Sequence, residues 1–113
     1  MYLKIGNTVL TATLADNQAA RELAQRLPLT LDLRDYGGFE KVGSLGFSLP
    51  RADVSVTAQP GEFVLYQGNQ FVLFYGQNTW SYTRLGRIDG MTAQQLQEIL
   101  GGGNVTVTLS AER

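Results

Sequence analysis

The chain has 113 residues, of which 43% are hydrophobic and 17% are charged. This length is typical of one domain, so we expect a single domain over residues 1–113 with one main core and a lightly charged surface. The sequence contains no histidine and no cysteine. It therefore excludes metal sites built from these residues, disulfides, thiol nucleophiles and catalytic triads that need an imidazole, and we expect neither a metal nor a cofactor.

The charge pattern argues against two classes of partner. Nine basic and ten acidic residues give a net charge of −1, and no two basic residues adjoin. Nucleic-acid binding needs a dense positive surface, so we expect no nucleic-acid partner. No apolar run approaches the roughly 20 residues that a membrane helix needs, and we expect no membrane partner. The chain does not start like a signal peptide, which predicts a cytoplasmic protein, although an exported protein trimmed of its signal would have the same sequence.

The N-terminal region predicts a hairpin followed by a helix. Residues 3–5 and 9–14 alternate apolar and polar side chains around a Gly-Asn pair, which is typical of a β-hairpin. From residue 17 to 27 the apolar positions recur at helical spacing along one stripe. Asp16 or Asn17 can cap this helix, and the proline that follows it ends it.

The next stretch predicts two strands separated by an ambiguous region. Residues 29–34 alternate leucines with polar side chains, as a strand with one buried face does. A glycine pair breaks this pattern at residues 35–38. Residues 40–49 carry apolar side chains interrupted by glycines and have no clear period. Two valines at residues 54–56 suggest a further short strand.

The centre of the chain predicts a very apolar hairpin. Residues 62–66 and 71–75 flank a short polar turn. The second strand has two apolar faces, one with Phe71, Leu73 and Tyr75 and the other with Val72 and Phe74. Only one face can fill a barrel, so the other needs cover from a helix, a loop or a ligand. Another short strand is expected at residues 85–88.

The C-terminal region predicts a helix and a last strand. Residues 91–100 carry an apolar stripe, and Thr92 and Gln95 have the spacing of a capping box. Three glycines end this helix, and residues 105–109 alternate apolar side chains with threonines. About eight strands and two short helices in so small a chain predict a mainly β fold, a closed or nearly closed antiparallel barrel whose ends the helices cap.

The order of segments resembles the bacterial and archaeal cyclophilin-like fold proteins, small barrels that mostly have no assigned activity. The segments that carry the resemblance are Leu14-Ala-Asp-Asn-Gln-Ala-Ala-Arg21, Leu27-Pro-Leu29, Asp35-Tyr-Gly-Gly-Phe-Glu-Lys41, Gly61-Glu-Phe-Val-Leu-Tyr66, Phe74-Tyr-Gly76 and Leu85-Gly-Arg-Ile-Asp89. The resemblance extends over residues 3 to 112 and implies a cyclophilin-type barrel.

A fainter likeness links the chain to the true cyclophilins, which are peptidyl-prolyl isomerases. Phe71-Val-Leu-Phe, Trp80 and Leu85-Gly-Arg-Ile-Asp-Gly-Met91 are similar to the stretch in which those enzymes place a pocket aromatic, a tryptophan and a Phe-Gly-Lys-Val segment. The Phe-His-Arg and Gln-Gly-Gly segments that line their proline pocket are missing here. The resemblance therefore implies the fold more strongly than the activity.

An isomerase without histidine would still need a donor aimed at the prolyl nitrogen, and arginine suits that role. The arginines that qualify are Arg34, Arg51, Arg84 and Arg87, and Arg87 shares strand parity with the apolar Leu85. The alternative is that each is a surface residue whose stem covers apolar area.

Polar and aromatic residues gather in two further places. Asp35, Tyr36, Glu40 and Lys41 form the densest polar group, and a desolvated Asp35 or Glu40 would suit acid–base work. The alternative is a glycine-rich connection in which Glu40 and Lys41 are solvated. Trp80 lies in a turn-like stretch, which predicts a loop tip that acts as a ligand platform, an interface anchor or a lid on the barrel.

These observations favour a non-catalytic domain that binds a small molecule or an extended, proline-containing peptide. The ligand-binding residues that we expect are Tyr36, Glu40, Tyr66, Tyr75, Trp80 and Arg87. No residue is assigned a catalytic role. Two alternatives stay open: a divergent prolyl isomerase with an arginine donor, and a dimerising module with Trp80 in its interface. The chain is expected to be a monomer or a weak homodimer.

Overall fold

Nine strands and two short helices make up the part of the chain that the computed structural model describes, residues 1–112. The strands are β1 (Tyr2–Ile5), β2 (Thr8–Leu14), β3 (Leu29–Tyr36), β4 (Glu40–Ser44), β5 (Val54–Ala58), β6 (Glu62–Tyr66), β7 (Gln70–Phe74), β8 (Asn78–Ile88) and β9 (Val105–Ser110). The helices are α1 (Gln18–Gln25) and α2 (Ala93–Leu100). This confirms the expected mainly β fold with two helices.

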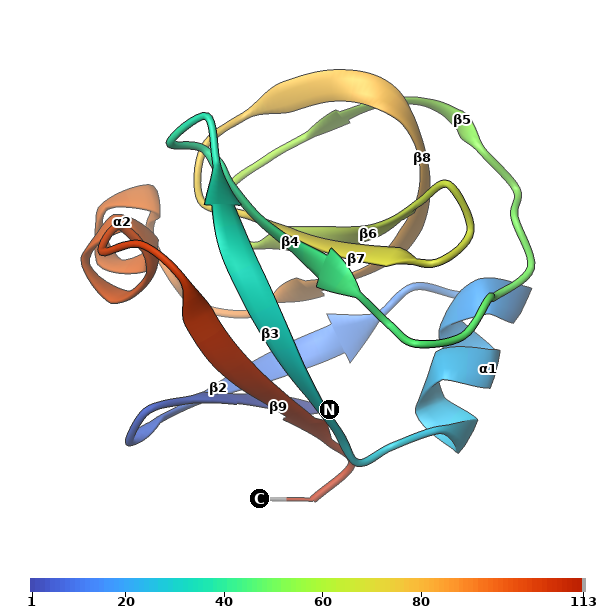
Figure 1. The fold of residues 1–113 in the computed structure, drawn as a ribbon, viewed down its shortest axis with the longest axis horizontal. Helices are drawn as coiled ribbons and strands as arrows, with labels where there is room; N and C mark the ends of the chain where they lie inside the picture. The colour runs from blue at the N-terminus through green and yellow to red at the C-terminus, as the bar shows by residue number, and fades with distance from the viewer. Residues whose placement is uncertain (113) are drawn as a thin grey trace.

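Eight of the strands form a ring. The strand order is β2-β1-β9-β3-β4-β7-β6-β8, and β8 pairs again with β2, so the two ends of the sheet meet. Every pairing is antiparallel. Figure 1 shows the ring from the side on which β3, β4 and β9 lie nearest the viewer. The nearly closed barrel leaves few strand edges unpaired.

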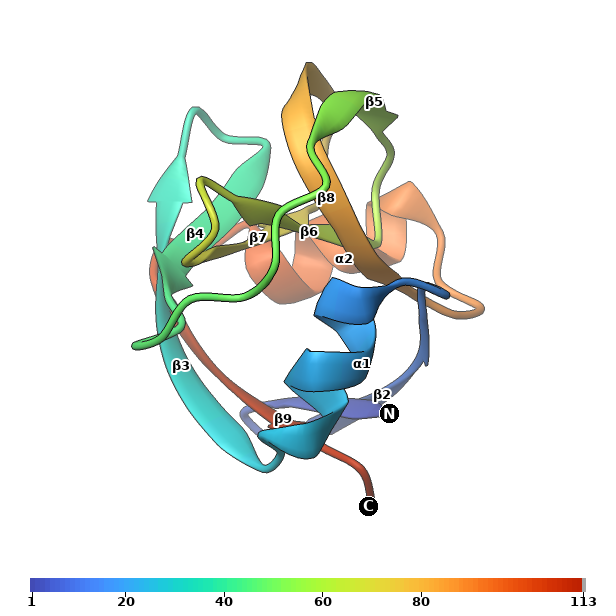
Figure 2. The same cartoon turned by 90° about the vertical axis from the view of Figure 1, so that its right-hand side faces the viewer.

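The two helices lie on opposite sides of the ring, as Figures 1 and 2 show in turn. Asn17 caps α1, because its side chain accepts a hydrogen bond from the Ala20 amide at 2.8 Å. Thr92 and Gln95 form the expected capping box at the start of α2. Neither helix is long enough to be stable alone, so each depends on the apolar side chains that it buries against the barrel.

The barrel is filled by one large apolar cluster, which we call the barrel core. It contains alternate residues of the ring strands and buried leucines of both helices: Leu3, Leu31, Leu33, Phe63, Leu65, Phe71, Leu73, Tyr75, Leu85, Leu23, Leu96 and Leu100 are among its members. Phe63 and Phe71 stack inside it with ring centroids 5.4 Å apart. Of the two apolar faces predicted for β7, the face with Phe71 is the one that fills the barrel.

The other face of β7 is covered by β5 and the first half of β8. β5 is the strand of the described chain that lies outside the ring. It pairs with β8 from Val54–Tyr82 to Ala58–Asn78. Together they fold over the outside of the β4-β7-β6 sheet, as the upper part of Figure 1 shows. A second cluster, the outer core, forms between the two layers from Val42, Val56, Ala58, Val64, Val72, Phe74 and Tyr82. The second apolar face of β7, which was predicted to need cover, is therefore covered by β5 and the first half of β8, which we call the β5–β8 ribbon.

Two boundaries differ from the sequence-based expectation. β3 continues through Tyr36, whereas a break was expected from residue 35. β8 starts at Asn78 rather than at residue 85, so Trp80 lies within a strand and the prediction of a loop tip is wrong. The cause is the same in both cases: these strand segments have one largely exposed face, and their polar residues look like turns in the sequence.

Candidate functional site

A groove opens between the β3–β4 hairpin and the β5–β8 ribbon, beside the outer core. Its volume is about 520 Å³, within the usual range for small-molecule sites. We call it the aromatic groove, and it is lined by Arg34, Tyr36, Phe39, Glu40, Val42, Tyr66, Asn78, Trp80 and Tyr82. Four of the six predicted ligand-binding residues line it: Tyr36, Glu40, Tyr66 and Trp80.

Strand alternation explains why these residues meet. Tyr36 pairs with Glu40 and Arg34 pairs with Val42 across the β3–β4 hairpin, so all four share one face. Asn78, Trp80 and Tyr82 are likewise alternate residues of β8 and lie on one face of that strand. The two faces point toward each other across the outer core. Sequence reasoning missed Arg34 as a neighbour of Tyr36, and Asn78 and Tyr82 as neighbours of Trp80, although strand parity would have grouped them.

The hairpin that carries Tyr36 and Glu40 is held at its tip by Phe39. The Phe39 carbonyl accepts hydrogen bonds from the amides of Tyr75 and Gly76, at 3.0 and 2.8 Å. A Cβ atom at Gly76 would lie 2.6 Å from the Phe39 Cβ, so this close approach requires glycine. Tyr36 packs edge-on against the Phe39 ring, with centroids 6.0 Å apart.

Two exposed aromatic side chains flank the groove. Tyr36 is 60% exposed and Trp80 is 59% exposed, and the third large exposed apolar residue is Val54. Trp80 makes no ring-to-ring contact with another aromatic side chain of residues 1–112. Large aromatic surface left in water beside a cavity marks an interaction site rather than a core.

Glu40 is the buried acidic group of the groove. It is 7% exposed, and no side chain or amide in the described part of the chain donates a hydrogen bond to its carboxyl. Burial raises the pKa of Glu40 to about 7; the nearby Arg34 guanidinium opposes the rise in pKa and the Asp35 carboxylate adds to it. The alternative in which Glu40 is solvated is wrong.

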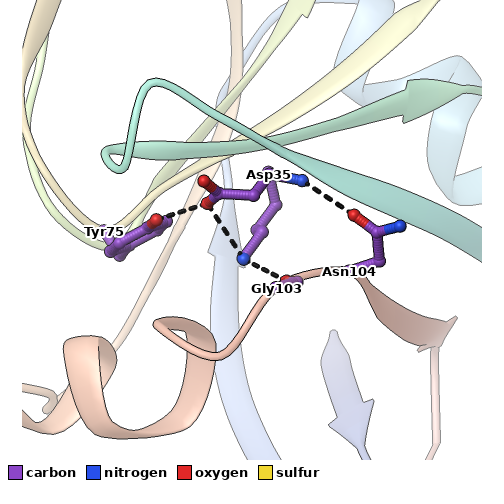
Figure 3. Close-up of polar contacts among 5 residues, drawn as sticks. Asp35, Tyr75, Gly103 and Asn104 are labelled. Atoms are coloured by element: carbon purple, nitrogen blue, oxygen red, sulfur yellow. Dashed lines mark hydrogen bonds and ion pairs between the residues drawn. The ribbon is translucent and has the colours of Figure 1, made fainter.

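Lys41 lies on the opposite face of β4, inside the barrel. It pairs with Leu73 of the barrel core, whereas Glu40 pairs with Phe74 of the outer core. Lys41 is fully buried, and its ammonium lies 3.0 Å from Asp35 Oδ1 and also donates to the Gly103 carbonyl (Figure 3). The alternative in which Lys41 is solvated is therefore wrong as well.

Tyr75, which we expected at the ligand site, belongs to this buried network instead. Its hydroxyl donates to Asp35 Oδ1, and the Lys41 ammonium lies 5.2 Å from the centre of its ring. The Tyr75 hydroxyl and the Lys41 ammonium lower the pKa of Asp35, while burial and the bond to Asp35 raise the pKa of Tyr75 to about 12. Asn104 completes the network by accepting a hydrogen bond from the Asp35 amide at 3.2 Å. Tyr75 is 5% exposed and does not line the groove.

Arg87 also lies away from the groove. Its side chain is exposed and its guanidinium is 3.5 Å from the Asp89 carboxylate, so the inward orientation suggested by its parity with Leu85 is wrong. The physical reason is a register shift where β6 pairs with β8, between Phe63 and Val64, which interrupts simple alternation. Arg51 and Arg84 are exposed and form ion pairs with acidic neighbours, at 2.6 and 2.5 Å. Of the four arginines that qualified as donors, Arg34 is the one that lines the groove.

The comparisons with known proteins agree with this architecture. Residues 3–110 match the Cyclophilin-like family. The chain belongs to the cyclophilin-like family. The solution structure of a hypothetical protein from Archaeoglobus fulgidus is similar to it with a TM-score of 0.70 and 14% identity, over 96% of this chain and 91% of that one. No curated protein sequence matches this chain.

This membership confirms the suspected family and establishes a cyclophilin-like domain, while the likeness to the archaeal structure shows the fold alone. The family and the fold do not by themselves say what the groove contacts, which depends on the residues that line it. Among residues 1–112 no three acidic side chains gather in a way that would hold a metal ion. No helix in this part of the chain is long and apolar enough to cross a membrane. Five aromatic rings, one valine, one arginine, one glutamate and one asparagine line this cyclophilin-like groove.

Proposed function

We propose that this protein is a non-catalytic binding domain that holds a small organic molecule in the aromatic groove. The observation that carries the proposal is the placement of Tyr36 and Trp80. Both are about 60% exposed, they come from separate strands, and both line one cavity of about 520 Å³. A ligand held between them would remove two large aromatic surfaces from water.

The rest of the lining supports the same proposal. Val42, Tyr66 and Tyr82 supply apolar surface that continues into the outer core. Arg34, Asn78 and Glu40 are the few polar groups. An apolar cavity with a small number of polar groups is the usual composition of a small-molecule site, where apolar contact supplies affinity and polar groups set orientation.

The experiment uses the single tryptophan as a reporter. A set of small aromatic compounds is titrated into the protein, with Trp80 fluorescence and backbone amide NMR shifts as readouts. We expect the shifts to gather at residues that line the groove. Trp80→Ala should weaken binding about tenfold, measured by the NMR shifts, because it removes one aromatic surface.

Val54→Ala is the matched control for this experiment. Val54 is as exposed as Trp80, at 60%, but does not line the groove. Its substitution should leave every affinity unchanged. If the two variants lose affinity equally, or if no compound in the set shifts any groove residue, the proposed function is wrong.

A second function, prolyl isomerisation, is favoured by one observation. Arg34 lines the groove beside the aromatic surfaces, where a donor for the prolyl nitrogen of a bound peptide would be needed. Isomerisation requires no covalent chemistry, because the barrier of about 18–20 kcal/mol comes from the double-bond character of the peptide bond.

A proline-peptide assay separates this second function from simple binding. Under it, the wild type accelerates isomerisation, Arg34→Ala abolishes the acceleration, and Arg87→Ala, which changes an arginine outside the groove, retains it. A wild-type rate equal to the rate in buffer removes the isomerase function and leaves the binding domain.

A further inference from the structure

Glu40 has a property that the proposed binding of a generic aromatic molecule does not explain. Its carboxyl is largely withdrawn from water, and no donor of residues 1–112 forms a hydrogen bond with it. A buried carboxylate is costly unless it is paired. Lys41 is the other buried charged side chain among the described residues, and it is paired with Asp35.

The Glu40 carboxyl is nevertheless open to the groove. No fully enclosed side-chain oxygen or nitrogen of the described residues lacks a hydrogen-bond partner. Because the Glu40 oxygens have no protein partner, they must keep some contact with the space of the groove that Glu40 lines. A ligand in the groove can therefore reach them.

The surroundings of Glu40 determine what such a ligand would offer. Arg34 on β3 is close enough to act on its charge but forms no ion pair with it. Asp35 also acts on the charge of Glu40 but lies on the opposite face of β3. Tyr82 of β8 lines the groove together with Glu40. Tyr66 of β6 lies beside Tyr82, and Tyr36 of β3 is the direct cross-strand partner of Glu40. The charged and titratable groups that the neighbouring strands place around Glu40 are therefore Arg34, Asp35, Tyr36, Tyr66 and Tyr82.

The missing partner is a cationic donor. A single carboxylate cannot hold a metal ion, which needs several ligands, and the described residues contain no such cluster. An ammonium group supplies both the positive charge and the N–H donors that the carboxylate lacks. The aromatic rings that line the groove would attract the same charge through their faces.

We infer that the aromatic groove binds a small organic amine and sets its ammonium group against the Glu40 carboxylate, an inference that rests on the proposed function of the groove as a ligand site. The groove volume and the aromatic walls suit an amine attached to a flat ring. Arg34 stands where it would contact a second, anionic group of such a molecule.

The inference carries a pH dependence. An alkyl ammonium keeps its proton to about pH 10, as the lysine side chain does. The pKa of Glu40 is about 7, so the carboxylate form that pairs with the ammonium becomes dominant only above neutrality. Affinity for an amine should therefore rise about tenfold between pH 6 and pH 8, while affinity for a neutral ligand should fall or stay level.

Benzylamine and benzyl alcohol are the probes, since they differ in the ammonium group and share the ring. Their dissociation constants are measured at pH 6 and pH 8 by amide NMR shifts, which follow even millimolar binding. We expect the wild type to favour benzylamine about tenfold or more at pH 8 and to lose most of this preference at pH 6.

Glu40→Gln removes the charge and keeps the shape. It should reduce benzylamine affinity at pH 8 about tenfold, remove the pH dependence and leave benzyl alcohol unaffected. Glu98→Gln is the control with the same change in net charge, because Glu98 is exposed on α2 and does not line the groove. It should behave as the wild type.

The outcomes separate this inference from the proposed function. If benzyl alcohol shifts the groove residues and benzylamine binds no better at pH 8, the groove binds ligands but the amine inference is wrong. If neither compound nor any of the other aromatic compounds shifts a groove residue, the proposed function fails and the inference falls with it. The wild-type pH series decides the matter even if Glu40→Gln does not fold.

Discussion

Glu40 and Lys41 are consecutive residues of one strand and both are buried, but they differ in the polar partners of their side chains. Lys41 points into the barrel, where Asp35, the Gly103 carbonyl and the Tyr75 ring all contact its ammonium. Glu40 points to the other face of the sheet and has no hydrogen-bond partner among residues 1–112. One buried charge is fully compensated and the other is not.

The difference indicates that the Lys41 side chain stabilises the fold, whereas the Glu40 side chain does not. The Lys41 network joins the β3–β4 hairpin to the residue after β7 and to the loop before β9, so it fixes the relative positions of three regions that are distant in sequence (Figure 3). Lys41 is fully buried and its ammonium is bonded to Asp35 and to the Gly103 carbonyl, so this charge is not open to a ligand. Glu40 contributes no such contact, and its burial opposes folding when it is charged. A residue that costs stability and faces a cavity is better explained by a ligand than by the fold.

The largest expected effect is the loss of the Lys41 network. Lys41→Met keeps most of the buried apolar stem, but it leaves the Gly103 carbonyl without its side-chain donor and leaves Asp35 with the Tyr75 hydroxyl and without its cation. We expect the free energy of unfolding to fall by about 3 kcal/mol. Lys4→Met is the matched control, because Lys4 is exposed on β1, and should change stability by less than about 0.5 kcal/mol. Urea unfolding of both variants measures the difference. A loss at position 41 no larger than at position 4 would show that the network does not hold the barrel.

The second largest expected effect is a gain in the free energy of unfolding, when the charge of Glu40 is removed. Because the pKa of Glu40 is raised from 4.5 to about 7 in the folded chain, the folded state holds a proton that the unfolded state releases between these values. Stability contributed by the neutral carboxyl is present below pH 4.5 and is lost as the pH rises through 7, by about 3 kcal/mol in all.

Glu40→Gln should therefore be more stable than the wild type at pH 8, because the glutamine carries no charge. The expected gain is about 2 kcal/mol and not the full 3 kcal/mol, because burying the polar amide also costs free energy. The gap should close at about pH 4.5. Unfolding curves at these two pH values provide the test, with Glu98→Gln, the same substitution at an exposed side chain, as the control. Asp35 behaves in the reverse way: its lowered pKa means that its contribution persists at neutral pH and is lost only in acid. A wild type that gains stability from pH 5 to pH 8 would contradict the assignment to Glu40.

Most of the fold could be predicted from the sequence, because local signals and tertiary demands coincide. The hairpin around Gly6, the helix capped by Asn17 and the capping box of Thr92 each follow a local rule and each is present. The two apolar faces of β7 correctly predicted that something must cover the barrel from outside.

The candidate site was predictable only in part, because its geometry depends on contacts between distant strands. No local signal showed that residues 78–82 form a strand, since their partners on β5 lie 20 to 28 residues upstream. Arg34 was weighed as an isomerase donor but not grouped with Trp80 for that reason. Tyr75 and Arg87 were misplaced because the sequence does not show which face of a strand closes the barrel, nor where a register shift occurs.

A smaller effect tests whether Trp80 belongs to the ligand site and not to the fold. Because Trp80 is 59% exposed, Trp80→Ala should lower the free energy of unfolding by no more than about 1 kcal/mol, close to the effect of Val54→Ala at 60% exposure. Thermal unfolding compares the two. A loss of several kcal/mol at position 80 alone would show that the indole is a structural lid on the outer core and that its position is explained without a ligand between Tyr36 and Trp80.

The smallest effect concerns the charge that acts on Glu40 from across the β3–β4 hairpin. The Arg34 guanidinium stabilises the ionised carboxyl, so Arg34→Gln should raise the pKa of Glu40 above 7, by about half a unit. Carbon-13 NMR of the Glu40 carboxyl follows the titration directly, and Arg87→Gln, which removes an equal charge outside the groove, should leave it in place. The pH at which benzylamine affinity rises should move upward with the Glu40 titration in the first variant. An unchanged binding profile beside a shifted Glu40 titration would mean that some other group senses pH, and the pairing of the ammonium with Glu40 would be wrong.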